Sequence, residues 1–133
     1  MNILFYLIPK KDVAFIESTK SLRQAMEKME HHHYSRIPIL DKDGSYSGSI
    51  SEGDILWYVK NNNIDINKCG CIRIQDVPHD RELTPLKIDA SIDDLTKLIT
   101  EQNFVPIVDD RHKFIGIVTR KAVIKELIKK IED

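Results

Sequence analysis

Hydrophobic residues along this chain alternate between two spacings, one typical of amphipathic helices and one typical of strands. A spacing of three to four residues predicts one helix over residues 22–29 and another over residues 92–99. A short extended stretch precedes each helix, and two strands and a further helix follow it. The predicted elements are, in chain order, strand 13–16, helix 22–29, strands 36–40 and 46–50 and helix 52–59, then strand 86–88, helix 92–99, strands 104–108 and 114–118 and helix 120–131.

The two halves also share short motifs. Residues 35–41, Ser-Arg-Ile-Pro-Ile-Leu-Asp, are echoed by residues 103–109, Asn-Phe-Val-Pro-Ile-Val-Asp. A constant spacing of 68 residues separates Pro38 from Pro106 and Ser51 from Thr119, so the chain is an internal repeat. We expect an α/β fold of the α+β type, with two βαββα repeats packed with pseudo-two-fold symmetry, because a half of about 60 residues buries little surface alone. The expected division is 1–62 for the first repeat, 63–78 for a connecting segment and 79–133 for the second repeat.

Composition narrows the class of protein. The 133 residues hold 20 Lys and Arg against 21 Asp and Glu, and this balance argues against a broad nucleic-acid-binding surface. The longest apolar run, residues 3–8, is far shorter than the roughly 20 residues of a membrane span and lacks the basic start of a signal peptide. We therefore expect a soluble, cytoplasmic protein that binds neither nucleic acid nor membrane.

Two polar clusters invite a metal interpretation that the spacing does not favour. Consecutive histidines at 31–33 cannot all point to one ion from a helix, and no carboxylate cluster is placed to join them. Cys69 and Cys71 lack the second pair that a zinc site needs, and we interpret them as reduced thiols. We interpret the histidines as the polar end of the first helix and its following loop. We expect no metal and no cofactor, and the functional roles of the histidines and cysteines stay open.

The repeated motifs resemble a known family. A hydrophobic-Pro strand, a hairpin and then Gly-hydrophobic-x-Ser/Thr where a strand meets a helix resemble a tandem pair of CBS domains, often called a Bateman module. The ending, residues 116–121 through 125–127, is similar to small stand-alone bacterial CBS proteins that bind cyclic di-AMP. The resemblance covers nearly the whole chain.

The resemblance implies a regulatory module without catalytic activity. Such a module binds an adenine nucleotide (AMP, ATP or cyclic di-AMP) in clefts between its two repeats, pairs into a homodimer and signals ligand state to a protein target. In this family a ribose-binding Asp follows the strand-to-helix junction; it is present as Asp54, but the matching residue of the second repeat is Ala122. The two candidate clefts are therefore expected to differ.

One candidate cleft centres on the start of the last helix. Thr119 stands where a hydroxyl caps free backbone N–H groups. Arg120 and Lys121 place cations at the positive end of that helix, and a bound anion would offset the resulting repulsion. The alternative is a plain cap with solvated or paired charges. By family correspondence the first repeat completes this cleft with residues 13–16 and with Tyr34 and Ser35. These residues of the first repeat are Val13, Ala14, Phe15, Ile16, Tyr34 and Ser35.

The other candidate cleft centres on Asp54, Arg36 and Ser51, and Ser51 stands at the same helix-cap position as Thr119. A carboxylate can accept hydrogen bonds from both hydroxyls of a ribose, and an arginine can grip a phosphate. The alternative is an Asp54–Arg36 salt bridge with no ligand. The expected base contacts come from Ile88, Asp89, Asn103 and Phe104.

Catalysis has little support in the sequence. The phosphate loop, the dinucleotide-binding glycine pattern, the HExxH zinc motif and the GxSxG elbow are all missing from the sequence. We therefore expect a ligand sensor that is not an enzyme. A ligand-free interaction or oligomerisation module is the alternative, favoured by Ala122 in place of the family Asp.

Overall fold

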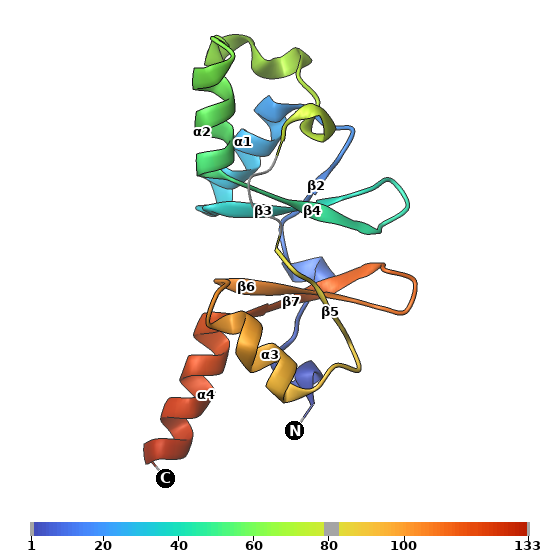
Figure 1. The fold of residues 1–133 in the computed structure, drawn as a ribbon, viewed down its shortest axis with the longest axis vertical. Helices are drawn as coiled ribbons and strands as arrows, with labels where there is room; N and C mark the ends of the chain where they lie inside the picture. The colour runs from blue at the N-terminus through green and yellow to red at the C-terminus, as the bar shows by residue number, and fades with distance from the viewer. Residues whose placement is uncertain (1, 79–82, 133) are drawn as a thin grey trace. The chain divides into compact units, whose positions relative to one another are not determined.

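The computed structural model describes residues 2–78 and 83–132, which form two compact units. One unit holds residues 14–78, and the other holds residues 2–13 together with residues 83–132. Each unit is a small sheet with two α-helices on one of its faces (Figure 1). The fold is therefore the expected mixture of strands and helices, made twice.

In the first unit, the strands β2 (Ile16–Glu17), β3 (Arg36–Leu40) and β4 (Tyr46–Ser51) form a sheet in that order. β3 pairs parallel with β2 and antiparallel with β4. The helices α1 (Leu22–His32) and α2 (Glu52–Asn61) cover the sheet. Their apolar faces explain this packing, because Leu22, Ala25 and Ile55 are buried against Ile37 and Ile50 of the sheet.

Two short 3₁₀-helices complete the first unit. η3 (Ile66–Cys71) and η4 (Ile74–Asp76) follow α2, in the stretch that the sequence assigned to a connecting segment. Ile74 is 0% exposed and Val77 3% exposed, and both belong to the same core as Leu22. This stretch is thus part of the first unit's core, while the expected boundary at residue 79 lies outside the described residues.

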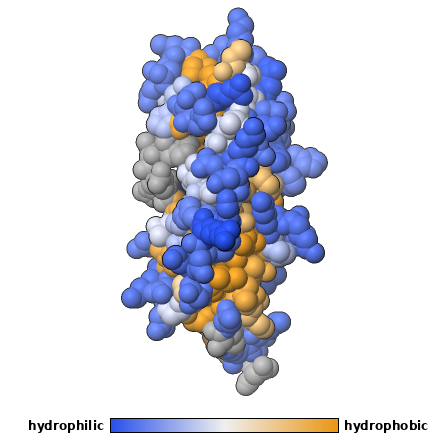
Figure 2. Space-filling view, turned by 90° about the vertical axis from the view of Figure 1, so that its right-hand side faces the viewer, coloured by the Kyte–Doolittle hydropathy of each residue, from blue (hydrophilic) through white to orange (hydrophobic). Residues whose placement is uncertain are grey.

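In the second unit, four strands pair in the order β1 (Ile8–Pro9), β7 (Phe114–Thr119), β6 (Phe104–Val108), β5 (Leu86–Lys87). The helices α3 (Ile92–Ile99) and α4 (Arg120–Glu132) lie on one face of this sheet (Figure 1). No residue of α4, which the structure describes in full, is buried. Figure 2 shows hydrophobic side chains gathered in the lower part of the view, where this unit lies.

The start of the chain is built into the second unit. Residues 2–13 supply the 3₁₀-helices η1 (Ile3–Tyr6) and η2 (Lys10–Asp12) and the edge strand β1. β1 pairs antiparallel with β7, with Ile8 opposite Ile117, and Ile3 is 1% exposed in the core of this unit. The sequence division placed these residues with the first repeat, whereas in the structure they pack with residues 83–132.

Most predicted elements are present, and their ends differ for identifiable reasons. The strand expected over 13–16 is limited to Ile16–Glu17, because side chains bond the backbone before it. The Ala14 N–H donates to Tyr34 Oη over 3.3 Å, and the Lys28 ammonium donates to the Phe15 carbonyl over 2.6 Å. α1 runs past the last apolar position of its pattern, Met29, into the histidines that were expected to end it, and stops at His33, which takes the left-handed conformation.

Candidate functional site

Two matched corners stand where a strand passes into a helix. In the first unit, Ser51 Oγ accepts a hydrogen bond from the Asp54 N–H over 3.0 Å; in the second, Thr119 Oγ1 accepts from the Ala122 N–H over 3.1 Å. The next residue of each corner also donates its backbone N–H to the residue before the neighbouring strand. These bonds are Glu52 to the Ser35 carbonyl over 2.9 Å and Arg120 to the Asn103 carbonyl over 2.8 Å. Both hydroxyls are helix caps, as the sequence predicted.

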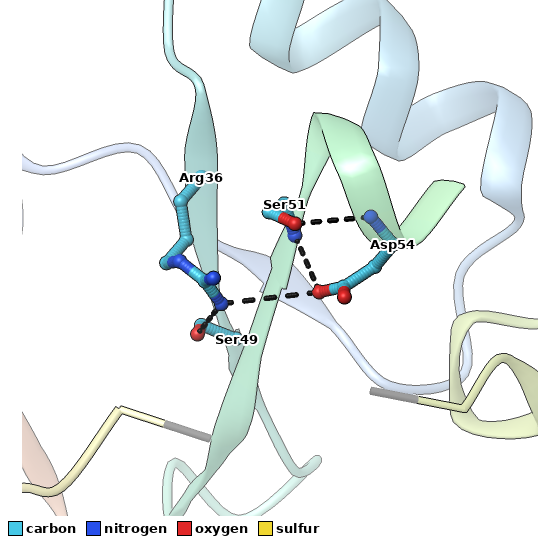
Figure 3. Close-up of polar contacts among 4 residues, drawn as sticks. All are labelled: Arg36, Ser49, Ser51 and Asp54. Atoms are coloured by element: carbon cyan, nitrogen blue, oxygen red, sulfur yellow. Dashed lines mark hydrogen bonds and ion pairs between the residues drawn. The ribbon is translucent and has the colours of Figure 1, made fainter. Parts of the chain in front are cut away.

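The first corner contains a polar cluster that bonds within itself (Figure 3). Arg36 Nη1 donates to Ser49 Oγ over 2.9 Å and lies 3.9 Å from Asp54 Oδ2. The same carboxylate oxygen accepts from the Ser51 N–H over 2.9 Å. The Asp54 side chain is 5% exposed and that of Arg36 19% exposed. The ion pair that the sequence left open as the alternative to a ligand is therefore present.

The second corner opens onto a hollow of about 420 Å³. Its wall consists of residues from the start of α4 and from the approach to β6, namely Asn103, Thr119, Arg120, Lys121, Ile124 and Lys125. Three of these side chains are cations and none is an anion. Within residues 2–78 and 83–132, none of the three cations has a carboxylate partner.

Arg120 is oriented by a neighbouring helix. Its Nε donates to the Ile99 carbonyl over 2.8 Å, at the last residue of α3. A cation at this end of a helix interacts favourably with the unsatisfied carbonyls there. The bond fixes one edge of the guanidinium group, whose planar fork suits bidentate binding of a phosphate.

Charge at the helix start distinguishes the two corners. The first turn of α2 holds the acidic Glu52 and Asp54, which complement the positive end of the helix, whereas the first turn of α4 holds no acidic residue. The repeat spacing also places Phe104 where the first unit has Arg36, and Ala122 where it has Asp54. An anion is therefore already supplied inside the first corner and is lacking in the second.

The remaining predicted site residues lie in several places. Val13 is buried and caps η2, while Phe15 and Ile16 line a separate hollow of about 630 Å³ beside α1. Ile88 and Asp89 line a third hollow, of about 470 Å³, at the start of α3. Ala14 and Tyr34 are joined by their hydrogen bond, and Phe104 opens β6.

One grouping differs from the sequence interpretation. Asn103 was assigned to the cleft of Ser51, but it lines the same hollow as Thr119, Arg120 and Lys121. Ile124 and Lys125 were not singled out for this hollow. The signal was available, because residues three and four positions after Lys121 lie on the same side of a helix.

The histidines and cysteines form no metal centre among the described residues. His31 and His32 end α1, and the His32 ring lies 5.6 Å from the ring of Tyr34. Cys69 is buried and Cys71 exposed, and both are free thiols. In the described part of the chain, every helix is too short or too polar to cross a membrane.

Comparisons with known proteins agree on one family. The sequence model of the CBS domain matches residues 7–61 and 74–129. Two solved structures are similar to this chain over nearly its whole length. CbpB in complex with c-di-AMP is 26% identical with a TM-score of 0.90, the match covering 100% of this chain and 88% of that one. CbpB of Listeria monocytogenes in complex with c-di-AMP is 25% identical with a TM-score of 0.82, covering 98% and 97%.

A curated relative is similar at the level of sequence. An uncharacterized protein of Methanocaldococcus jannaschii is 29% identical, and the match covers 91% of this chain and 89% of the relative. It has nearly the same extent as this chain.

Proposed function

Because the chain belongs to the CBS domain family and carries two such domains, we propose that it is a regulatory module that binds an adenine nucleotide and conveys its binding to a partner protein. The observation that carries this proposal is the hollow at the start of α4, where Arg120, Lys121 and Lys125 meet without a carboxylate. Cations that lack a carboxylate partner favour an anionic ligand. A nucleotide phosphate is the anion that the family relationship supplies.

The chemistry of the hollow suits a phosphate group. The positive end of the α4 dipole lies at this hollow and favours negative charge there. Arg120 adds charge-assisted hydrogen bonds, each worth about 1.5–3 kcal/mol. Thr119 both caps the helix and lines the hollow, so its hydroxyl is in place beside such a ligand.

Cyclic di-AMP is the nucleotide best supported as the ligand. Two similar structures hold it, and Ala122 removes the carboxylate that would accept from a free ribose diol. Cyclic di-AMP has no such diol, because its 3′ oxygens are esterified. AMP and ATP are the other nucleotides to compare with it.

A ligand-free interaction module is the second candidate function. The observation that favours it is the Arg36–Asp54 pair, in which a carboxylate suited to a ribose is already bonded within the chain. On this alternative the first corner is purely structural, and the module acts through its surfaces alone.

Calorimetric titration with AMP, ATP and cyclic di-AMP separates the two candidates. We expect at least one nucleotide to bind, and Arg120→Ala to weaken that binding about ten- to a hundredfold. Arg111→Ala is the matched control, because Arg111 lies in the exposed hairpin turn and does not line the hollow. Absence of binding by all three nucleotides would leave the interaction module as the function.

A further inference from the structure

Lys125 extends the cationic wall of the hollow by one helical turn. It follows Lys121 by four residues on α4, a spacing that places the two β-carbons about 5–6 Å apart on the same side of a helix. Like charges at this spacing repel each other and destabilise the helix. In the part of the chain that the structure describes, neither lysine has a carboxylate partner that would offset this repulsion.

The three cations are arranged in two groups. Arg120 and Lys121 stand in the first turn of α4 beside Thr119, at the positive end of the helix dipole, where a single phosphate would meet both cations. Lys125 stands one turn further along the helix, away from that positive end. A second anionic group of the same ligand would meet it there.

We propose that Lys125 is a further anion-binding residue of this hollow, and that it selects ligands with two phosphate groups over ligands with one. The inference rests on the proposed nucleotide function. AMP offers a single phosphate, whereas the diphosphate chain of ADP and the ring of cyclic di-AMP each offer two. The shared chemistry is a pair of phosphates attached to one ligand, and the two sources are separated by testing both.

The test compares Lys125→Gln with Lys130→Gln. Both variants remove one positive charge from α4, but Lys130 lies in the last turn and does not line the hollow. The probes are AMP, ADP, cyclic di-AMP and inorganic pyrophosphate, titrated by calorimetry at two salt concentrations. We expect Lys125→Gln to weaken the binding of ADP, of cyclic di-AMP or of both by about two- to fivefold. The affinity for AMP should stay within error of the wild type. Higher salt should reduce that difference, because it screens exposed charges.

Each result has a defined meaning. If Lys125→Gln weakens the binding of ADP alone, the pair of phosphates recognised is that of a linear diphosphate. If it weakens the binding of cyclic di-AMP alone, the pair is that of the cyclic dinucleotide. Equal losses for AMP and the two-phosphate ligands, or the same losses in Lys130→Gln, overturn the inference and leave the nucleotide function standing. Binding of pyrophosphate that depends on Lys125, with no nucleotide bound, refutes the nucleotide function but retains the two-phosphate site. No binding of any probe refutes both.

Discussion

The Ile8 carbonyl oxygen lies so close to Gly116 that a β-carbon on this glycine would stand 2.1 Å from it. The contact arises because β1 pairs with β7, which puts Pro9 opposite Gly116. Only a residue without a side chain permits the two backbones to approach this closely.

Gly116→Ala should therefore destabilise the protein. Because the new methyl group meets backbone that must move, we expect the free energy of unfolding to fall by about 1–3 kcal/mol or more, measured by urea denaturation. Gly53→Ala is the control: its β-carbon meets only Ser51 Oγ at 3.7 Å, within α2, where Ala is the better helix former. Equal stability of Gly116→Ala and the wild type would show that β1 does not hold this position in solution.

Asp54→Ala should lower stability without weakening a nucleotide held beside Thr119. The change removes the carboxylate half of the α2 capping box and the ion pair to the mostly buried Arg36 guanidinium, which keeps its hydrogen bond to Ser49, at a cost of about 1–3 kcal/mol. Asp94→Ala is the matched control, because Asp94 makes the same capping box on α3 in an exposed position. Its cost should be about 0.5–1 kcal/mol. Cyclic di-AMP binding lost in Asp54→Ala and kept in Arg120→Ala would reverse the proposed roles of the two corners.

The chain should form a homodimer. Apolar side chains of α4 are exposed, including Leu127 at 53% and Ile131 at 83%, and burying such a surface against a second copy is favourable. Light scattering at micromolar concentration should give about twice the chain mass of 15.4 kDa. Leu127→Glu should shift the protein toward monomer, whereas Leu4→Glu, at a residue 48% exposed on η1, should not. A wild-type mass of one chain would contradict this prediction.

Asp109 should make stability depend on pH at the acidic end. The Lys113 N–H donates to its carboxylate over 2.9 Å and the Arg111 N–H over 2.8 Å, which holds the pKa of Asp109 below its usual value of 3.8. A carboxyl with a lowered pKa stabilises the fold fully above that usual value, and the contribution is lost as pH falls through the lower, folded-state pKa. Asp109→Asn should thus be less stable than the wild type at pH 7, and the difference should shrink in acid. Asp110→Asn serves as the charge-matched control, and a difference that does not vary with pH would refute the assignment.

Ligand binding should raise the melting temperature. A nucleotide at about a hundred times its dissociation constant contributes roughly 2.7 kcal/mol, which corresponds to a shift of roughly 5–10 °C for a chain of this size. Differential scanning fluorimetry with cyclic di-AMP, with adenosine as the phosphate-free control, measures this shift. A shift produced equally by adenosine would show that phosphate binding in the hollow at the start of α4 is not responsible.

The repeat made the central strands predictable from sequence. Arg36–Leu40 and Phe104–Val108 have the predicted bounds, because buried hydrophobic runs flanked by turn residues leave a clear local pattern. The pairing of β1 with β7 left no such pattern, since a strand of two residues has no periodicity. A weaker signal was present, because Ile8-Pro9 recurs as Val77-Pro78. Each pair comes just before one repeat along the chain but belongs to the unit of the other repeat.

In the candidate site, the helix caps were predictable from the sequence, but the contacts between residues on different strands and helices were not. Ser51 and Thr119 cap their helices as expected, because capping depends on residues within one turn. The bond from Arg36 to Ser49 and the position of Asn103 beside Arg120 depend on how strands pair across a sheet, which spacing along the chain does not encode. Arg120 donating to the end of α3 belongs to the same class of long-range contact.

The inclusion of residues 2–13 in the second unit sets an order of events during synthesis. Residues 14–78 of the first unit are contiguous, so this unit can fold while the rest of the chain is still being made. β1 leaves the ribosome long before its partner β7, at residues 114–119, and cannot pair until β7 has been made. Until then Ile3 has no core to enter, so the apolar segment of residues 3–8 stays exposed while the residues between the two strands are translated.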